Sequence, residues 1–307
     1  MSNFIAQVLS TVPASHSVTY SCQFTNNWTS ESHPVNYPEN DAHWSAPVVV
    51  AHSNEYTMWE PGELASNGVR IVAETGDPDK LQREVAYRTR MNIEAGDVIT
   101  GEDQSNSNTQ EQTLPDIVMT PWFNMLSSIT MIAPSPDWYS GFYNVNPVDP
   151  KKMVWYKSFE IATYPWDAGT NKGKDFNSNN QAEDPRVPIQ QLTEGVLLNP
   201  DKTEVLAMAT WSCSLKGSSS FADSDIKGKS NKDCKWVGEN EKKRKSRCKK
   251  KYKGRPMSVW CPKACYMPEL STVPASHSVT YSCKFNNMWS SENHPINYPG
   301  NDAHWSA

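Results

Sequence analysis

The sequence lacks a long apolar segment and any familiar catalytic motif. Its longest apolar candidate is residues 47–51, far short of the roughly 18 residues that a membrane span requires. It contains no G-x-S-x-G nucleophile elbow, no H-E-x-x-H zinc motif and no glycine-rich phosphate loop. The opening residues, MSNFIAQVLS, carry no basic stretch and too short an apolar run for a signal peptide. These absences predict a protein without a transmembrane segment and without enzymatic activity.

The residues that are abundant indicate β-structure. The chain has 22 Pro, 12 Trp and 12 Tyr, and this composition favours sheets joined by ordered loops. Residues 17–24 alternate apolar and polar side chains, as a half-buried strand does. We expect an all-β protein with one or two short helices. Further strands are expected at 125–133, 139–145, 153–159 and 204–211, helices at 61–75 and from 77 onward, and an exposed loop at 103–113.

Seven cysteines indicate an oxidising compartment. Four of them lie in a short polar segment with too few apolar residues to fold unaided, namely Cys234, Cys248, Cys261 and Cys265. Three disulfide connectivities are possible among these four, and a zinc site is the alternative. Cys22 in the first strand and Cys213 just after the last strand could bridge the ends of one domain. Asn27 begins a glycosylation sequon, Asn-Trp-Thr.

The chain contains an internal repeat. Residues 9–46 and 270–307 align without gaps and differ at seven positions. About 40 residues cannot bury enough surface to form a sandwich. We therefore expect a complete domain over residues 11–213, a linker with a small cysteine-rich module over 214–269, and a truncated start of a second copy over 270–307. Cys283, the equivalent of Cys22, would lack a partner.

Charge is distributed unevenly along the chain. Residues 227–255 contain 14 Lys and Arg against three acids, although the whole chain carries a net charge of −5. Such a segment attracts sulfated or phosphate-rich polyanions, whereas the alternative is a solvated linker. The candidate polyanion-binding residues are Lys242, Lys243, Arg244, Lys245, Arg247, Lys249, Lys250 and Lys251. Because aromatic residues are scattered within it, a nucleic-acid site is not expected.

A series of rare motifs resembles one known family. In order along the chain these are Asn27-Trp28, His33-Pro34, Tyr37-Pro38, Ala42-His43-Trp44-Ser45, Pro134-Ser135-Pro136-Asp137-Trp138 and Pro165-Trp166-Asp167-Ala168-Gly169-Thr170. Together they resemble the spondin domain of F-spondin and mindin over about residues 17–210. The resemblance implies an antiparallel all-β sandwich with C2-like topology, secretion, calcium in an end loop, and adhesion to matrix, to integrin-like proteins or to glycans. The thrombospondin repeats that usually follow this domain are absent.

The residues themselves also suggest a calcium site. Calcium takes six to eight hard oxygen ligands, and Asp137, Asp167 and Asn171 supply side-chain oxygens in two loops. The family has Asp at the position of Asn171, so calcium affinity should be weakened here. The alternative is that these residues cap turns through backbone amides. His33, His43 and His52 form a weaker metal candidate, because buried hydrogen-bonded histidine is the commoner case.

Three classes of function are compatible with the sequence. A secreted, calcium-binding adhesion or extracellular-matrix module is favoured. A calcium-dependent membrane-surface binder would need exposed groups on the calcium loops, for which Trp138 and Lys172 are candidates. A hydrolytic enzyme using paired carboxylates is the third class and the least favoured.

Overall fold

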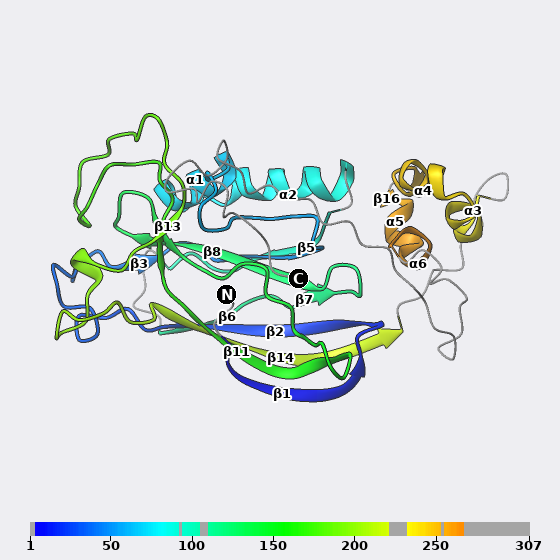
Figure 1. Ribbon diagram of the computed structural model, residues 1–307, viewed down its shortest axis with the longest axis horizontal. Coiled ribbons are helices and arrows are strands. Elements are labelled where there is room, and N and C mark those ends of the chain that lie inside the picture. Colours follow the sequence, from blue (N-terminus) through cyan, green and yellow to red (C-terminus); the bar gives the residue numbers. More distant parts are fainter. Residues whose placement is uncertain (1–3, 92–93, 105–109, 221–231, 253–254, 267–307) are drawn as a thin grey trace, which may run out of the picture. The chain divides into compact units, whose positions relative to one another are not determined.

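The computed structural model describes residues 4–91, 94–104, 110–220, 232–252 and 255–266. Residues 4–220 form a β-sandwich with two helices lying on one of its sheets (Figure 1). Every strand pairing in both sheets is antiparallel. The expected all-β antiparallel sandwich with short helices is therefore confirmed.

The first sheet is built on long strands that are far apart in sequence. Its order is β1 (Phe4–Pro13), β11 (Val154–Thr163), β14 (Ala209–Ser220), β2 (His16–Asn26) and β6 (Glu111–Thr113). Two short strands complete it, since β10 (Val148–Asp149) pairs with β11 and β7 (Ile117–Met119) pairs with β2. On β2 the inward side chains, Val18, Tyr20, Cys22 and Phe24, are all buried, as their alternation predicts.

The second sheet is buried on both faces. Its order is β13 (Gln190–Gln191), β12 (Pro165–Asp167), β9 (Trp138–Ser140), β8 (Met125–Ala133), β4 (Val48–His52) and β5 (Ala95–Thr100), and β3 (His43–Trp44) pairs with β8. On β4, Val49 and Ala51 join the core between the sheets, whereas Val48 and Val50 join the core under the helices. A strand buried on both faces needs a continuous apolar run, which explains why residues 47–51 are all apolar.

Two helices, α1 (Asn67–Thr75) and α2 (Asp79–Met91), cover the second sheet (Figure 1). The predicted start of the first helix at residue 61 is wrong, because Ser66 caps it by accepting a hydrogen bond from the Val69 N–H. Its predicted end is confirmed at Gly76, which has φ 74°. A Cβ there would lie 2.7 Å from the Ser45 Cβ. The expected start of the second helix is confirmed to within one residue, since α2 begins at Asp79 and the Asp77 carboxylate caps it by accepting a hydrogen bond from the Asp79 N–H at 2.8 Å.

Three strand predictions need correction. The strand expected at 139–145 ends at Ser140, because the N–H groups of Phe142 and Asn144 donate to serine hydroxyls on β8. The strand expected at 153–159 continues to Thr163. The strand expected at 204–211 begins at Ala209 and continues to Ser220. Its second half is polar and small, so only its pairing with β2 makes it a strand.

Two further segments differ from expectation. Strand β1 was not predicted, since it is a largely exposed edge strand with a weak apolar pattern. The loop expected at 103–113 contains β6 and two buried glutamines, Gln104 and Gln112. The Gln112 side chain donates to the Glu102 carbonyl and accepts from the Glu102 N–H, which accounts for its burial.

A disulfide joins the two central strands of the first sheet. Cys22 on β2 lies opposite Cys213 on β14, and the two are bonded. The expected bridge is confirmed, although Cys213 lies inside the last strand and not after it. The sequence separation of 191 residues means that this bond ties the beginning of the domain to its end.

The differences between the two copies of the repeat can be compared with side-chain burial in the first copy. Within residues 9–46 the buried side chains are Val18, Tyr20, Cys22, Phe24, Trp28, His33, Trp44 and Ser45. All eight are identical in the second copy, and the seven substitutions fall on positions that are not buried in the first copy. The second copy lies outside the described residues, so its conformation stays a prediction.

The cysteine-rich module, residues 232–266, consists of short elements joined by two disulfides. They are α3 (Cys234–Gly238), α4 (Glu241–Cys248), β15 (Lys251–Tyr252), β16 (Arg255–Pro256), α5 (Met257–Trp260) and α6 (Pro262–Tyr266). Cys234 bonds Cys261, and Cys248 bonds Cys265. The zinc alternative is therefore wrong, because all four thiols are used. None of the helices in the described ranges is both long and apolar enough to cross a bilayer.

Removing the bridge between β2 and β14 should destabilise the sandwich. The double variant Cys22→Ala/Cys213→Ala should lose about 2–4 kcal/mol of unfolding free energy, because a long loop is no longer closed in the unfolded chain. Chemical denaturation measures this loss. Ser214→Ala, an exposed position on the same strand, should stay within about 0.5 kcal/mol of the wild type. An equally stable double variant would contradict the role given to the bridge.

Candidate functional site

Two predicted metal ligands are brought together by strand pairing. Asp137 directly precedes β9 and Asp167 ends β12. The two strands are antiparallel neighbours with Trp138 opposite Asp167. The Ala168 N–H also donates to the Asp137 carbonyl at 3.2 Å. Both carboxylates therefore lie at one end of the second sheet, beside the loop over residues 168–171.

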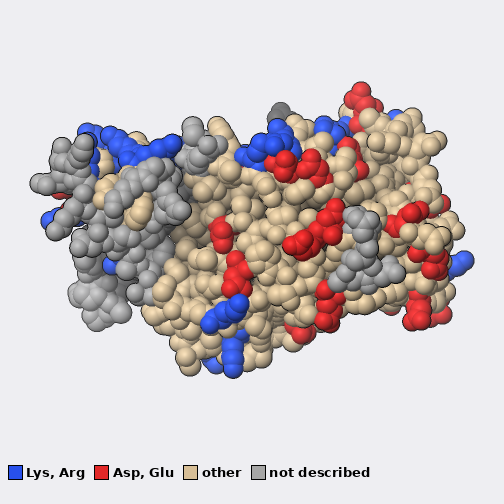
Figure 2. Space-filling view, turned by 180° about the vertical axis from the view of Figure 1, so that it is seen from behind, with Lys and Arg blue, Asp and Glu red and all other residues tan. Residues whose placement is uncertain are grey.

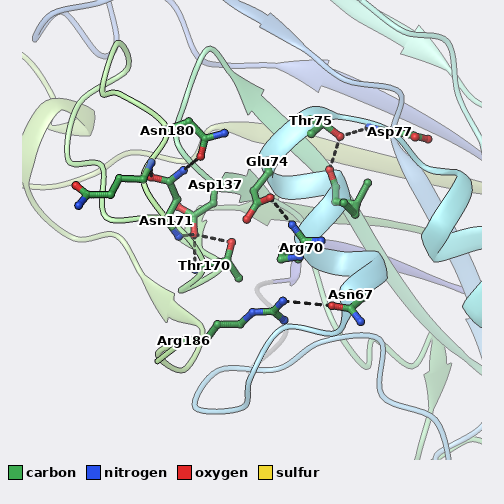
Figure 3. Close-up of polar contacts among 12 residues, drawn as sticks. Asn67, Arg70, Glu74, Thr75, Asp77, Asp137, Thr170, Asn171, Asn180 and Arg186 are labelled. Atoms are coloured by element: carbon green, nitrogen blue, oxygen red, sulfur yellow. Dashed lines mark hydrogen bonds and ion pairs between the residues drawn. The ribbon is translucent and has the colours of Figure 1, made fainter. Parts of the chain in front are cut away.

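Asp137 is a fully buried carboxylate with one oxygen in use. Its Oδ2 accepts hydrogen bonds from the Thr170 N–H at 2.7 Å, the Asn171 N–H at 3.0 Å and the Thr170 hydroxyl at 3.2 Å (Figure 3). Its Oδ1 is buried and has no hydrogen-bond partner among the described residues. A buried carboxylate oxygen without a partner is costly. This atom is the feature of the site that points to a cation.

The electrostatics of the pair also favour a cation. Burial and the neighbouring charge of Asp167 raise the pKa of Asp137 to about 7. Burial, followed by the charge of Glu183, raises the pKa of Asp167, while its hydrogen bond from the Gly169 N–H opposes the rise. A buried carboxylate whose ionised form is disfavoured by burial and by a neighbouring negative charge would be stabilised by a positive ion nearby.

Gly169 shapes the loop that holds both acids. It has φ 70°, a conformation that glycine adopts readily. A Cβ at this position would lie 2.0 Å from the Val187 carbonyl oxygen, which is backbone and cannot move aside. The Val187 N–H also donates a hydrogen bond to the Gly169 carbonyl at 3.0 Å, which holds the two backbone segments together. The glycine is therefore required for the loop to pack against residue 187.

Asn171 is engaged within its own loop. Its Oδ1 accepts from the N–H groups of Gly173 at 3.2 Å and Gln181 at 3.3 Å. Its Nδ2 donates to the Asn180 side chain (Figure 3). The amide thus ties residues 171–173 to residues 180–181, so both lone pairs of its oxygen are occupied. Its assignment as a metal ligand stays a prediction.

Sequence reasoning missed two residues that belong to this region. Glu183 lies close enough to act on the pKa of Asp167, and Thr170 supplies both a backbone and a hydroxyl donor to Asp137. Glu183 belongs to the acidic run Glu183-Asp184, which was a signal available in the sequence. In the described part of the chain no three His, Cys, Asp or Glu residues are grouped for a metal. A calcium ion would therefore also need carbonyl oxygens and water.

The histidines and the sequon have structural contacts. His33 and His52 are buried, and each ring nitrogen of both residues has a hydrogen-bond partner. These two are core histidines, as the commoner case predicts. The Asn27 side chain donates to the Thr210 hydroxyl at 2.8 Å. Because glycosylation would replace this hydrogen bond, modification at Asn27 stays a prediction.

Comparison with known families agrees with this geometry. The family model Spondin_N matches residues 18–203. The chain belongs to the spondin domain family. The match covers most of the sandwich, including Asp137, Asp167 and the loop over residues 168–171, but not β1 or β14, and it ends before the cysteine-rich module. The family model therefore accounts for most of the sandwich and for none of the module.

Three relatives show how far the similarity extends. Spondin-1 of Rattus norvegicus and of Homo sapiens are each 33% identical over 178 residues, which is 57% of this chain and 22% of each relative. Spondin-2 of Rattus norvegicus is 31% identical over 176 residues, 57% of this chain and 52% of that protein. The chain thus spans about a fifth of Spondin-1 and about half of Spondin-2.

Acid should remove the contribution of His52 to the stability of the spondin domain. Burial lowers the pKa of His52 to about 4 from 6.5, so the unfolded chain binds a proton in this window that the folded chain does not. Its contribution to stability is therefore complete above pH 6.5 and is lost as the pH falls toward 4, by up to about 3 kcal/mol. Chemical denaturation at several pH values between 7 and 4 measures the slope of the unfolding free energy against pH. His52→Gln should flatten it, and an unchanged slope would contradict the assignment.

Proposed function

We propose that the spondin domain is a secreted, non-catalytic adhesion module of the extracellular matrix whose end loops are ordered by calcium. Two observations support this proposal. The chain is a member of the spondin family, and the buried Oδ1 of Asp137 has no hydrogen-bond partner in the described residues. The second observation carries the calcium part, because a hydrogen-bonded turn cap does not require a second, unpaired buried oxygen.

Asp137 and Asp167 are the residues that would hold the ion. Each already uses one oxygen to fix the loop over residues 168–171. The ion would supply positive charge to the remaining oxygens, and loop carbonyls and water would complete its shell. Under this proposal one oxygen of each acid caps a turn and the other would face the ion.

Calcium would act on binding through the loops. The Asn171 amide joins the 168–171 loop to residues 180–181, and Arg186 donates to the Asn67 side chain at the start of α1 (Figure 3). A fixed ion therefore reduces the freedom of a continuous set of surface loops, which lowers the entropic cost of binding a partner. The partner class is an extracellular protein, integrin-like in kind, or a glycan.

The membrane-surface alternative has less support. It needs exposed apolar groups on the calcium loops, and its candidate Trp138 is only 3% exposed. The ring of Trp138 packs against Phe176 with 5.6 Å between centroids. Lys172 is exposed, but one cation without an apolar anchor does not hold a protein on a membrane.

The hydrolase alternative fails on access. An acid with a pKa near neutrality beside a second carboxylate is a common catalytic arrangement. Asp137, however, is 0% exposed, so a substrate bond cannot reach its carboxyl group without displacement of the 168–171 loop. The pair therefore suits an enclosed ion better than a substrate.

Calcium titration of the full chain tests the proposal. Wild type should bind calcium and melt at a higher temperature, with about 2.7 kcal/mol of stabilisation at a hundredfold excess over the dissociation constant. Asp137→Asn and Asp167→Asn should each abolish both effects. Asp201→Asn, an exposed acid, is the matched control and should behave as wild type.

The possible outcomes separate the two interpretations of the site. A wild type that shows neither heat nor a melting shift would leave Asp137 and Asp167 as turn caps only. Calcium binding that survives in Asp137→Asn would place the ion elsewhere in the chain. In the absence of calcium, Asp137→Asn should melt no lower than wild type, because a neutral amide avoids the cost of a buried charge.

A further inference from the structure

The cysteine-rich module concentrates positive charge on a rigid scaffold. Helix α4 has the sequence EKKRKSRC, and the next three residues are lysines. In Figure 2 the Lys and Arg of this region form a blue cluster, whereas acidic residues are spread over the described surface of the spondin domain. This module lies outside the Spondin_N match, so family membership gives it no role.

The cations of α4 form two rows along the helix. Residues three and four apart lie on the same side of a helix, which places Lys242, Lys245 and Lys249 in one row. Lys243 and Arg247 form the second row, and Lys250 follows just after the end of the helix. At 1.5 Å per residue, the first row extends over about 10 Å. All four lysines at positions 242, 243, 245 and 250 are exposed.

This arrangement opposes the stability of the helix. Like charges three and four residues apart repel, and Lys242 and Lys243 lie in the first turn, where the helix dipole disfavours cations. Among the ion pairs of the described residues, none involves a cation of α4. The helix is held by the Asn240 cap and by the Cys248–Cys265 disulfide. A polyanion would relieve the repulsion among these cations.

Arg247 of the second row and Lys250 lie against an aromatic ring in the neighbouring helix. The Arg247 guanidinium lies 4.4 Å from the centroid of Trp236 and also donates to its carbonyl oxygen. The Lys250 ammonium lies 5.6 Å from the same centroid. Cation–π contacts of this kind hold the charges in place. The Cys234–Cys261 disulfide then fixes α3 to the residue that joins α5 and α6, so the cations are presented by a preorganised surface.

We propose that this surface, formed by the two cation rows of α4 and by Lys250 beside Trp236, is a binding site for a sulfated polysaccharide. Sulfate groups are permanent anions, and their repeat along a chain allows several to contact a row of lysines at once. Preorganised cations bind such a ligand with less ordering cost than a disordered basic tail. The site does not depend on calcium and is independent of the function proposed for the spondin domain.

The observations favour this ligand over other polyanions. Single-stranded nucleic acids stack their bases on free aromatic faces, but the Trp236 ring is covered by Arg247, and Tyr252 packs edge-on against Trp260 at 5.6 Å. Membrane anchors insert apolar side chains, and none of the exposed large apolar residues of the described chain lies in the module. The two disulfides also place the module in an oxidising compartment, where sulfated polysaccharides are available as ligands.

Binding of a heparin dodecasaccharide to the full chain tests the site. The triple variant Lys242→Gln/Lys245→Gln/Lys249→Gln should bind at least tenfold more weakly than wild type at 150 mM salt. Its plot of log affinity against log salt should lose about three units of slope, by analogy with counterion release from DNA. The matched control is Lys151→Gln/Lys152→Gln/Lys157→Gln, which removes the same charge from exposed lysines of the spondin domain. Equal losses in both triples would overturn the proposal.

Two further measurements separate a built site from plain charge. Cys248→Ser/Cys265→Ser keeps every cation but releases α4, and it should weaken dodecasaccharide binding at least fivefold; unchanged affinity would overturn the preorganised site. Wild type should prefer the dodecasaccharide to a DNA duplex of equal charge and to phosphatidylserine vesicles. Tighter binding to either comparator would overturn the ligand assignment. Binding that persists in EDTA and in Asp137→Asn shows that the site is separate from the calcium proposal.

Discussion

The pairing of β2 with β14 is the interaction on which the spondin domain depends. These strands come from opposite ends of the domain, they run side by side from His16 to Asn26, and the Cys22–Cys213 bond joins them. The apolar face of β2 supplies the first sheet with Val18, Tyr20 and Phe24 as core residues. Because β14 also pairs with β11, it connects β2 to the other long strands of the first sheet. The repeat keeps each buried residue of β2, which is what conservation of this pairing would require.

In the candidate calcium site the two carboxylate oxygens of Asp137 have different surroundings. Strand pairing between β9 and β12 brings Asp137 and Asp167 together, and backbone N–H groups occupy one oxygen of each. Hydrogen bonds alone would stabilise the loop, but they leave the buried Oδ1 of Asp137 without a partner in the described residues. The hydrogen bonds of the turn therefore determine the local geometry. The buried carboxylate oxygen without a partner is what suggests a metal.

The cysteine-rich module follows a different physical principle from the spondin domain. Few of its residues can form an apolar core, so disulfides at Cys234 and Cys248 replace much of what burial supplies in the sandwich. A covalently held scaffold tolerates repulsion that a marginal helix does not, which permits cations along one short helix. The acidic and basic parts of the chain are therefore suited to ligands of different charge.

The sequence alone determined the sandwich class, the strand β2, strand β8, the Cys22–Cys213 pair and the two acids of the site, because each depends on a local alternation or on a rare motif. It did not determine the extent of β14 or the presence of β1, since their polar or exposed residues become strands only through pairing with β2 and β11. It also left the four module cysteines open between zinc and three connectivities. Only the tertiary structure decided that choice and showed that the hydrogen bonds to Asp137 fall on one of its two oxygens, because both depend on which distant groups approach one another in space.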